Sequence, residues 1–166
     1  MRHFSEQELL NLSILFERDP QYTIYGTYFG FPNCCIESFI RCPGVHQWYK
    51  EGKHTGTGYI PCMHCMEKAN TQWDEHHALI QSRRISSKPF PEDRSHHRQW
   101  EIEVFFIEFC SMIGVNADEE AKKMHNETRI LKVLSDPERH QATFKRIRQK
   151  FTAWHPRERY LHLKIA

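Results

Sequence analysis

Two pairs of cysteines are the residues of this sequence best suited to chemistry. Cys34 and Cys35 are adjacent and follow a Pro-Asn dipeptide, and Cys62 and Cys65 form a Cys-x-x-Cys pair that follows a proline. Asparagine and proline favour the first positions of a helix, so each pair is expected at a helix start. A helix start presents unpaired N–H groups and a partial positive charge, which favour thiolate over thiol. These cysteines are therefore suited to bind a metal ion or to react.

The spacing of the four cysteines favours a zinc site. Two thiolates of a Cys-x-x-Cys pair can both reach one tetrahedral zinc ion at Zn–S distances of about 2.3 Å. The other pair ends at Cys35, 27 residues before Cys62, and supplies further ligands. Adjacent helical side chains diverge by about 100°. All four cysteines are candidate metal ligands. One of Cys34 and Cys35 with Cys62 and Cys65 is the easier geometry, and both bind one ion only if the backbone at Cys34 is not helical.

The other cysteines and the histidines are weaker candidates. Water, or a histidine such as His46 or His54, would complete a site of three cysteines. Cys42 lies about 10.5 Å along the helix from Cys35, too far to bind the same ion. The side chain of His64 should point away from the two cysteines that flank it. Cys110 lies in the most apolar segment of the chain and is interpreted as a small core residue.

A longer pattern includes three of these cysteines. Cys35-Ile36-Glu37, 23 intervening residues and Pro61-Cys62-x-x-Cys65 together resemble the signature of the zinc-dependent cytidine deaminase superfamily. The resemblance implies that Cys35, Cys62 and Cys65 hold zinc with a water molecule in the open fourth position. It also implies that Glu37 transfers the proton while a zinc-activated hydroxide attacks a cytosine-like base. That family packs a sheet between helices, whereas this sequence offers few strand-like segments.

Three segments together resemble a group of small uncharacterised bacterial and phage proteins. The segments are Gly-aromatic-Pro-x-Cys-Cys at Gly30 to Cys35, Gly-Thr-Gly-Tyr-x-Pro-Cys-x-x-Cys at Gly56 to Cys65, and Pro-Phe-Pro at residues 89–91. The resemblance implies one integrated domain over about residues 20–95. It implies no particular reaction.

Two redox chemistries stay open as alternatives. Four thiolates from a Cys-Cys and a Cys-x-x-Cys pair would also suit an iron–sulfur cluster. Cys62 and Cys65 alone would suit a dithiol redox protein, although no thioredoxin-like βαβ pattern surrounds them. The sequence has no phosphate-binding glycine loop, no Gly-x-Ser-x-Gly elbow and no His-Glu-x-x-His zinc motif. Whether the chain is an enzyme is therefore left open.

The composition predicts a cytoplasmic protein without a membrane span. The mean hydropathy is −0.71, and no apolar run approaches the roughly 20 residues of a transmembrane helix. The N-terminal residues lack the apolar block of a signal peptide. Disulfides rarely persist in the cytosol, which again favours metal or redox chemistry for the clustered cysteines.

Charge is distributed unevenly along the chain. Residues 121–166 hold 12 Lys and Arg residues and 4 Asp and Glu residues. Their net charge is +8, and residues 1–120 carry −6 because the whole chain carries +2. These basic residues are candidate contacts for nucleic acid or an acidic protein, and a solvated helix face is the simpler interpretation. Four of them lie outside the apolar stripe of the last predicted helix: Lys145, Arg146, Arg148 and Lys150.

Mainly helical elements are expected to position these residues. Residues 22–30 are β-branched and aromatic and predict a short strand or an ordered loop. Residues 44–58 predict a loop that ends in the extended Tyr59-Ile60. Ser5 and Asp118 are expected as N-caps. Helix-start, periodicity and helix-stop signals predict helices at about residues 5–18, from 33 to before 43, for one or two turns after 61, and at 71–84, 99–113, 119–135 and 137–155.

Together these features predict a small single domain that is mainly α with a minor β element (α+β). Residues 1–115 are expected to form the Cys-rich metal-binding core, and residues 116–166 a basic helical extension packed on it. The favoured function is a zinc-binding protein with a structural site and a binding role, directed at nucleic acid or an acidic protein. A zinc deaminase is the enzymatic alternative, and an iron–sulfur or dithiol redox protein is the second alternative.

Overall fold

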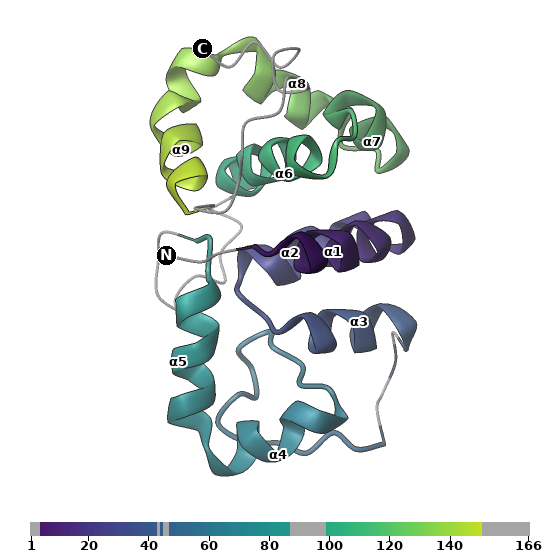
Figure 1. Cartoon of the computed structure of the whole chain (residues 1–166), viewed down its shortest axis with the longest axis vertical. Helices are drawn as coiled ribbons and strands as arrows, with labels where there is room; N and C mark the ends of the chain where they lie inside the picture. The colour runs from purple at the N-terminus through teal and green to yellow at the C-terminus, as the bar shows by residue number, and fades with distance from the viewer. Residues whose placement is uncertain (1–3, 43, 45–46, 87–98, 151–166) are drawn as a thin grey trace. The chain divides into compact units, whose positions relative to one another are not determined.

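The computed structural model of the chain describes residues 4–42, 44, 47–86 and 99–150. Within these ranges lie nine α-helices, which hold about 72% of the described residues, and no β-strand (Figure 1). The predicted mainly α character is confirmed, whereas the minor β element is absent from the described residues. No helix in these ranges has both the length and the apolar character that crossing a membrane requires.

The chain is divided into two compact units. Unit 1 comprises Met1–Ile14 and His96–Ala166, and unit 2 comprises Leu15–Ser95. The domain boundary that the sequence predicts after residue 115 falls inside unit 1. Helix α6 (Gln99–Ile113), expected in the cysteine-rich core, packs instead with the C-terminal helices. The physical reason is that α6 is buried along most of its length and needs apolar partners on several sides.

Helix α1 (Glu6–Arg18) begins as the sequence predicts. The Glu8 N–H donates to the Ser5 hydroxyl at 3.1 Å, which is one of the two hydrogen bonds of a capping box. The division between the two units falls within this helix, after Ile14.

Most of residues 22–30, predicted as a strand or loop, lie in helix α2 (Pro20–Tyr28). The Tyr22 N–H donates to the Asp19 carboxylate at 3.0 Å, and Pro20 is the first helical residue. Both are helix-start signals. The helix buries β-branched and aromatic side chains, so tertiary packing outweighs their preference for strands. The prediction of a strand here was wrong.

The rest of unit 2 consists of two helix pairs. Helix α2 packs against α3 (Asn33–Arg41), and α4 (Met63–Thr71) packs against α5 (Trp73–Arg83). Figure 1 shows the sharp turn between α4 and α5 and the long connection from α3 to α4. The starts of α3 and α4 share one hydrophobic cluster, whose buried members are Cys35, Tyr59, Cys62, Ala69 and Ile80.

Unit 1 is built around α6. Helices α7 (Ala117–Lys123), α8 (Glu127–Ser135) and α9 (Pro137–Gln149) all pack against it (Figure 1). The N-cap of α7 is Asn116, whose side chain accepts from the Glu119 N–H at 3.1 Å, and not the predicted Asp118. Asn116 and Asp118 are both good cap residues, so composition alone does not choose between them.

The single helix predicted at residues 119–135 is divided between α7 and α8. His125 has a φ of 57°, in the left-handed region. The N–H groups of His125 and Asn126 donate to the carbonyls of Lys122 and Ala121 at 3.2 and 2.9 Å. These two bonds end α7 in a Schellman motif. That motif usually contains glycine, so a histidine in its place gives no signal in the sequence.

The apolar stripe predicted for the last helix is buried in its described part. Phe144 and Ile147 of α9 are both almost fully buried. The other two predicted members, Phe151 and Trp154, lie outside the described residues, as does the end of the helix predicted to reach residue 155. The stripe therefore serves as core contact for unit 1 where the structure describes it.

Candidate metal centre

The structure brings the sulfur atoms of four cysteines together. The Sγ atoms of Cys34, Cys35, Cys62 and Cys65 all lie within 4.8 Å of one another. Those of Cys34 and Cys65 are 3.6 Å apart. All four are free cysteines, and they are the four residues that the sequence predicts as metal ligands. Two lie at the start of α3 and two at the start of α4, so an ion bound by all four would join these helices.

Gly30 sets the turn that leads into α3. It has a φ of 81°, and the N–H groups of Gly30 and Phe31 donate to the carbonyls of Thr27 and Gly26 at 3.1 and 2.8 Å. This is a Schellman motif at the end of α2. A Cβ atom at position 30 would lie 2.4 Å from the backbone oxygen of Ile80 in α5. Glycine is therefore required by both the backbone angle and the close approach.

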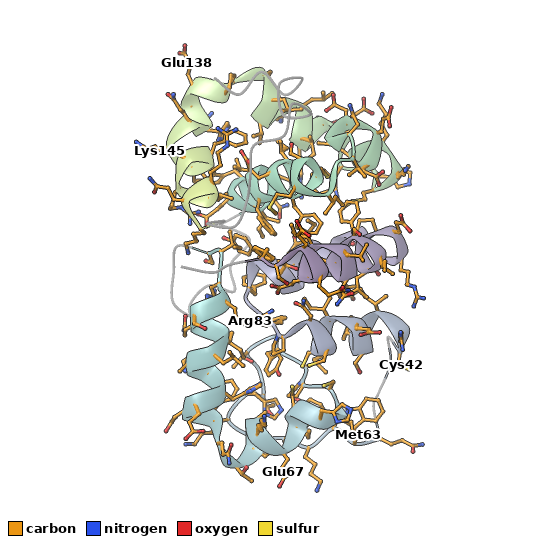
Figure 2. All side chains as sticks on the ribbon, in the orientation of Figure 1. Cys42, Met63, Glu67, Arg83, Glu138 and Lys145 are labelled. Atoms are coloured by element: carbon orange, nitrogen blue, oxygen red, sulfur yellow. The ribbon has the colours of Figure 1, made fainter. Side chains whose placement is uncertain are left out.

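Cys34 and Cys35 both lie on helical backbone in the first turn of α3. Both sulfur atoms nevertheless lie in the cluster, so the expectation that this would require a non-helical backbone at Cys34 was wrong. The Cα–Cβ bonds of a helix tilt toward its N-terminus, so side chains of the first turn can converge on a point beyond the helix end. Arg83 of α5 (Figure 2) donates to the side-chain oxygen of Asn33 at 3.0 Å and so fixes the orientation of this turn.

Cys62 and Cys65 lie together at the start of α4. Cys62 is the N-cap, with φ −72° and ψ 172°, and Cys65 is in the first turn. The Cys65 N–H donates to the Cys62 carbonyl at 3.0 Å. Pro61 precedes the cap and lies two positions before Met63, the first helical residue, so it is not the first-turn proline that the sequence suggested. Both sulfur atoms are thus near one helix end, as a chelating Cys-x-x-Cys pair requires.

Hydrogen bonds among the sulfur atoms perturb their proton affinities. Hydrogen bonding with Cys35 lowers the pKa values of the Cys34 and Cys62 thiols below 9.0. Hydrogen bonding with Cys34 raises the pKa values of Cys35 and Cys65, and burial raises them further. Four thiolates this close to one another repel strongly. A divalent cation offsets that repulsion, and its binding would displace the protons that the cluster still holds.

The four-cysteine cluster is buried on one side and open on the other. Cys35 and Cys62 are only 3% and 5% exposed, and Phe31 and Trp73 pack against the same hydrophobic cluster. Cys34 is exposed, so the cluster has one edge that solvent reaches. An ion here would therefore be held mainly inside unit 2 and would be accessible from the Cys34 side.

Tyr59 and His76 adjoin the cluster, although neither is a candidate from the sequence. The Tyr59 hydroxyl oxygen is 3.2 Å from the Cys35 sulfur and 2.7 Å from Nε2 of His76. Burial raises the pKa of Tyr59 above 10.0 and lowers the pKa of His76 below 6.5. At neutral pH the tyrosine therefore keeps its proton and the histidine is uncharged.

A glycine-rich turn directs Tyr59 into the site. Gly56 and Gly58 have φ values of 78° and 84°, which favour glycine. The Thr57 hydroxyl donates to the His54 carbonyl and accepts from the Tyr59 N–H. The Gly-Thr-Gly-Tyr segment is the signal that could have identified Tyr59 in the sequence. Nothing comparable distinguishes His76 from its neighbouring histidine.

Glu37, the acid/base implied by the deaminase resemblance, is not one of the clustered residues. Its carboxylate pairs with Arg41 one turn along α3 at 2.5 Å, and its side chain is 42% exposed. Cys42 lies at the C-cap of α3, at the opposite end from the cluster (Figure 2), as its spacing predicts. Cys110 is fully buried in α6, as predicted.

The candidate histidines do not join the four cysteines where the structure describes them. His54 is fully buried, and burial lowers its pKa below 6.5. His64 is exposed on α4, as predicted. His46 lies outside the described residues. The ring of His54 lies against three aromatic rings, those of Tyr49, Tyr59 and Trp73.

The four basic residues predicted as nucleic-acid contacts have different surroundings. Arg146 pairs with buried Glu101 at 2.7 Å, and Arg148 pairs with buried Glu108 at 3.0 Å. Both glutamates belong to α6, so these arginines connect α9 to the core of unit 1. The two lysines lie further toward solvent: Lys145, exposed on the outer face of α9 (Figure 2), and the partly exposed Lys150.

Comparison of the chain with protein-family models, with curated proteins and with solved structures finds no match. The two motif resemblances stay predictions. The Pro-Phe-Pro segment that contributes to the second one, residues 89–91, lies outside the described residues. A function for this chain must therefore be inferred from the four cysteines and the side chains around them.

Proposed function

We propose that this chain is a zinc-binding protein with a closed, structural four-cysteine site. The observation that carries the proposal is the approach of four sulfur atoms to within 4.8 Å of one another. A tetrahedral site with Zn–S distances of about 2.3 Å has sulfur–sulfur edges of about 3.8 Å. The 3.6 Å separation between Cys34 and Cys65 is close to that edge. Small side-chain rotations would bring the remaining sulfur atoms to the same spacing.

The same distances favour a single ion over an iron–sulfur cluster. A cluster places several iron atoms and bridging sulfides between its cysteine ligands, so its cysteine sulfurs must stand further apart than in a mononuclear site. Four sulfur atoms within 4.8 Å leave room for one ion. Soft thiolate ligands in a tetrahedral arrangement are characteristic of zinc among single ions.

The ligand set favours a structural site over a catalytic one. Structural zinc sites have four protein ligands, whereas catalytic sites keep one position for water. In a deaminase-like site, water would complete the coordination by Cys35, Cys62 and Cys65. Here Cys34 lies among the sulfur atoms and can take that position. The carboxylate of Glu37 is engaged by Arg41, which also favours the structural role.

An ion at this position would fasten the start of α3 to the start of α4 and close the loop from Cys35 to Cys62. Because the ligands come from two separate elements, the fold of unit 2 should depend on the ion. The molecular role that we propose for such a chain is binding. The basic C-terminal region keeps nucleic acid or an acidic protein as its candidate partner, with Lys145 the exposed member of the set. Such binding should weaken steeply as salt rises.

The first test is the metal content of the protein purified without added metal. Elemental analysis of the wild type should find about one zinc per chain, and no iron. The variants Cys35→Ser and Cys62→Ser should lose most of it, because each removes a buried ligand. Cys42→Ser is the matched control, since Cys42 is an exposed cysteine at the far end of α3. It should retain the zinc of the wild type.

The outcomes separate the alternatives. Bound iron with broad visible absorption would indicate an iron–sulfur or single-iron site in place of the proposed zinc site. No bound metal in the wild type, even after zinc is supplied under reducing conditions, would overturn the metal proposal. A hydrolytic activity that Glu37→Gln abolishes while zinc stays bound would overturn the structural role and favour the deaminase alternative.

A further inference from the structure

Three buried groups form a hydrogen-bonded chain that leads away from the cysteines. The Tyr59 hydroxyl lies between the Cys35 sulfur, at 3.2 Å, and Nε2 of His76, at 2.7 Å. Cys35, Tyr59 and His76 are 3%, 2% and 5% exposed, respectively. They come from three elements: α3, the connection before α4, and α5. A four-cysteine zinc site does not require either Tyr59 or His76 as a ligand.

We propose that Tyr59 and His76 are positioning residues: His76 orients the Tyr59 hydroxyl to donate to the Cys35 sulfur, and this hydrogen bond sets the metal affinity of the site. The inference rests on the proposed zinc site and deepens it. Cys35 would differ from the other three ligands, because its sulfur is the one within hydrogen-bond distance of the Tyr59 hydroxyl. Cys35 also accepts the Cys62 N–H at 3.4 Å, so its sulfur receives two donors.

A metal ion bound to Cys35 restricts the directions that the hydrogen bonds of the chain can take. A cysteine bound to zinc has no proton on sulfur, so Cys35 can only accept. The Tyr59 hydroxyl has one proton, so a hydrogen bond between Tyr59 and a metal-bound Cys35 requires the hydroxyl to donate that proton to the sulfur. The Tyr59 oxygen can then only accept from His76, so Nε2 of the neutral imidazole must carry the proton of the ring. His76 thus orients the tyrosine toward the sulfur.

If the hydrogen bond between Tyr59 and His76 ran in the opposite direction, the loss of His76 would have a different effect on metal binding. If Nε2 of His76 carried no proton, the Tyr59 hydroxyl would donate to His76 and not to Cys35. Removing His76 would then release the hydroxyl to donate to the thiolate, and metal binding would become tighter. In the direction that we propose, removing His76 weakens metal binding. The sign of the effect at His76 therefore distinguishes the two directions.

The expected size of the effect follows from other metal sites. Loss of a hydrogen-bond partner of a ligand typically lowers metal affinity by about 10- to 100-fold. Tyr59→Phe removes only the hydroxyl, so we expect a loss in that range. His76→Leu removes the donor but leaves the tyrosine, so we expect a smaller loss. His76→Gln keeps an N–H donor and should therefore recover part of the metal affinity that His76→Leu loses.

The experiment measures zinc affinity of the full chain by competition with a chromogenic chelator under reducing conditions. Tyr49→Phe is the matched control, because it makes the same chemical change on a tyrosine whose ring contacts His54. Circular dichroism of each zinc-loaded variant checks that the helices are retained. Cobalt(II) substitution gives a second readout, the energy of the sulfur-to-cobalt charge-transfer bands. Loss of a hydrogen bond to a thiolate should move these bands to longer wavelength in Tyr59→Phe and leave them unchanged in Tyr49→Phe.

The possible results test the inference separately from the site itself. A wild type that binds no zinc would defeat the proposed function. A wild type that binds zinc, with unchanged affinity and cobalt bands in Tyr59→Phe, would defeat the inference alone. Tighter zinc binding in His76→Leu would show the opposite hydrogen-bond direction and also defeat it. If Tyr59→Phe fails to fold, the comparison of His76→Leu with His76→Gln still decides, because equal affinities in the two variants contradict the proposed donor.

Discussion

At the scale of single residues, Glu108 is the most deeply buried acid in the part of the chain that the structure describes. Its side chain is fully buried in α6. Burial raises its pKa from 4.5 to about 7, and the nearby Arg148 opposes the shift without cancelling it. The native state therefore binds this proton more tightly than the unfolded chain does. The contribution of Glu108 to stability must fall as pH rises from about 4.5 through 7.

We expect Glu108→Gln to remove this part of the pH dependence. A shift of this size corresponds to about 3 kcal/mol at most between low and high pH. Urea unfolding at pH 5 and pH 8 should show the variant gaining stability relative to the wild type at pH 8. Both proteins contain the four clustered cysteines, so comparing the two at each pH cancels the pH dependence of that cluster. A stability difference that is the same at both pH values would contradict the raised pKa of Glu108.

At the scale of elements, one glycine determines where α3 begins relative to α5. Gly30 combines a φ of 81° with a position where a Cβ atom would lie 2.4 Å from the Ile80 oxygen and 2.9 Å from the Arg84 nitrogen. Neither backbone atom can move without distorting the end of α5. The start of α3, and with it Cys34 and Cys35, depends on this close approach.

Gly30→Ala should therefore destabilise unit 2 strongly. The left-handed backbone and the backbone clash together predict a loss on the order of 3 kcal/mol in the free energy of unfolding. Chemical denaturation of the zinc-loaded protein measures it. Gly44→Ala is the control, because a Cβ atom there meets no heavy atom within 4 Å. It should stay within about 0.5 kcal/mol of the wild type, and an equally mild Gly30→Ala would refute the packing argument.

Elements with strong local signals could be predicted from the sequence, and those decided by packing could not. The starts of α1, α3 and α4 follow cap residues and prolines, so the cysteine pairs were located correctly. Residues 22–30 form a helix because burial outweighs the strand preference of β-branched side chains. The break at His125 relies on a left-handed histidine that propensity does not anticipate.

The candidate site shows the same limit. Residue types and spacing identified the four cysteines, because their chemistry is local to each pair. The convergence of adjacent Cys34 and Cys35 was missed, since rotation about a helix axis describes side chains in mid-helix better than those at its end. His76 was missed because its contact with Tyr59 spans 17 residues and arises only in the folded chain.

At the scale of the whole molecule, the four clustered cysteines and the buried glutamates belong to different units. All four cysteines lie in unit 2, whereas the glutamates of α6 and their arginine partners lie in unit 1. Each unit has its own helices packed on one another. Loss of the ion should therefore act first on unit 2.

Hydrogen exchange followed by mass spectrometry can test this division. Removing zinc with a chelator should speed exchange in peptides from residues 33–83, because the ion no longer joins α3 to α4. Peptides from residues 99–150 should change little. The Cys62→Ser variant without chelator should reproduce the pattern, which controls for effects of the chelator itself. Equal acceleration in both ranges would show that the ion supports the entire chain.

An ion bound by the four cysteines would close a loop from Cys35 to Cys62, which consists of α3 and its connection to α4. The entropy of closing such a loop grows slowly with its length, by about 0.6 kcal/mol for each doubling. Gly44, within it, is exposed, and its surroundings leave open space for additional atoms. New sequence could therefore be inserted at Gly44, by evolution or by an engineer, while the ion keeps the two ends together. The metal site would make this loop a place where the protein can acquire length without losing its fold.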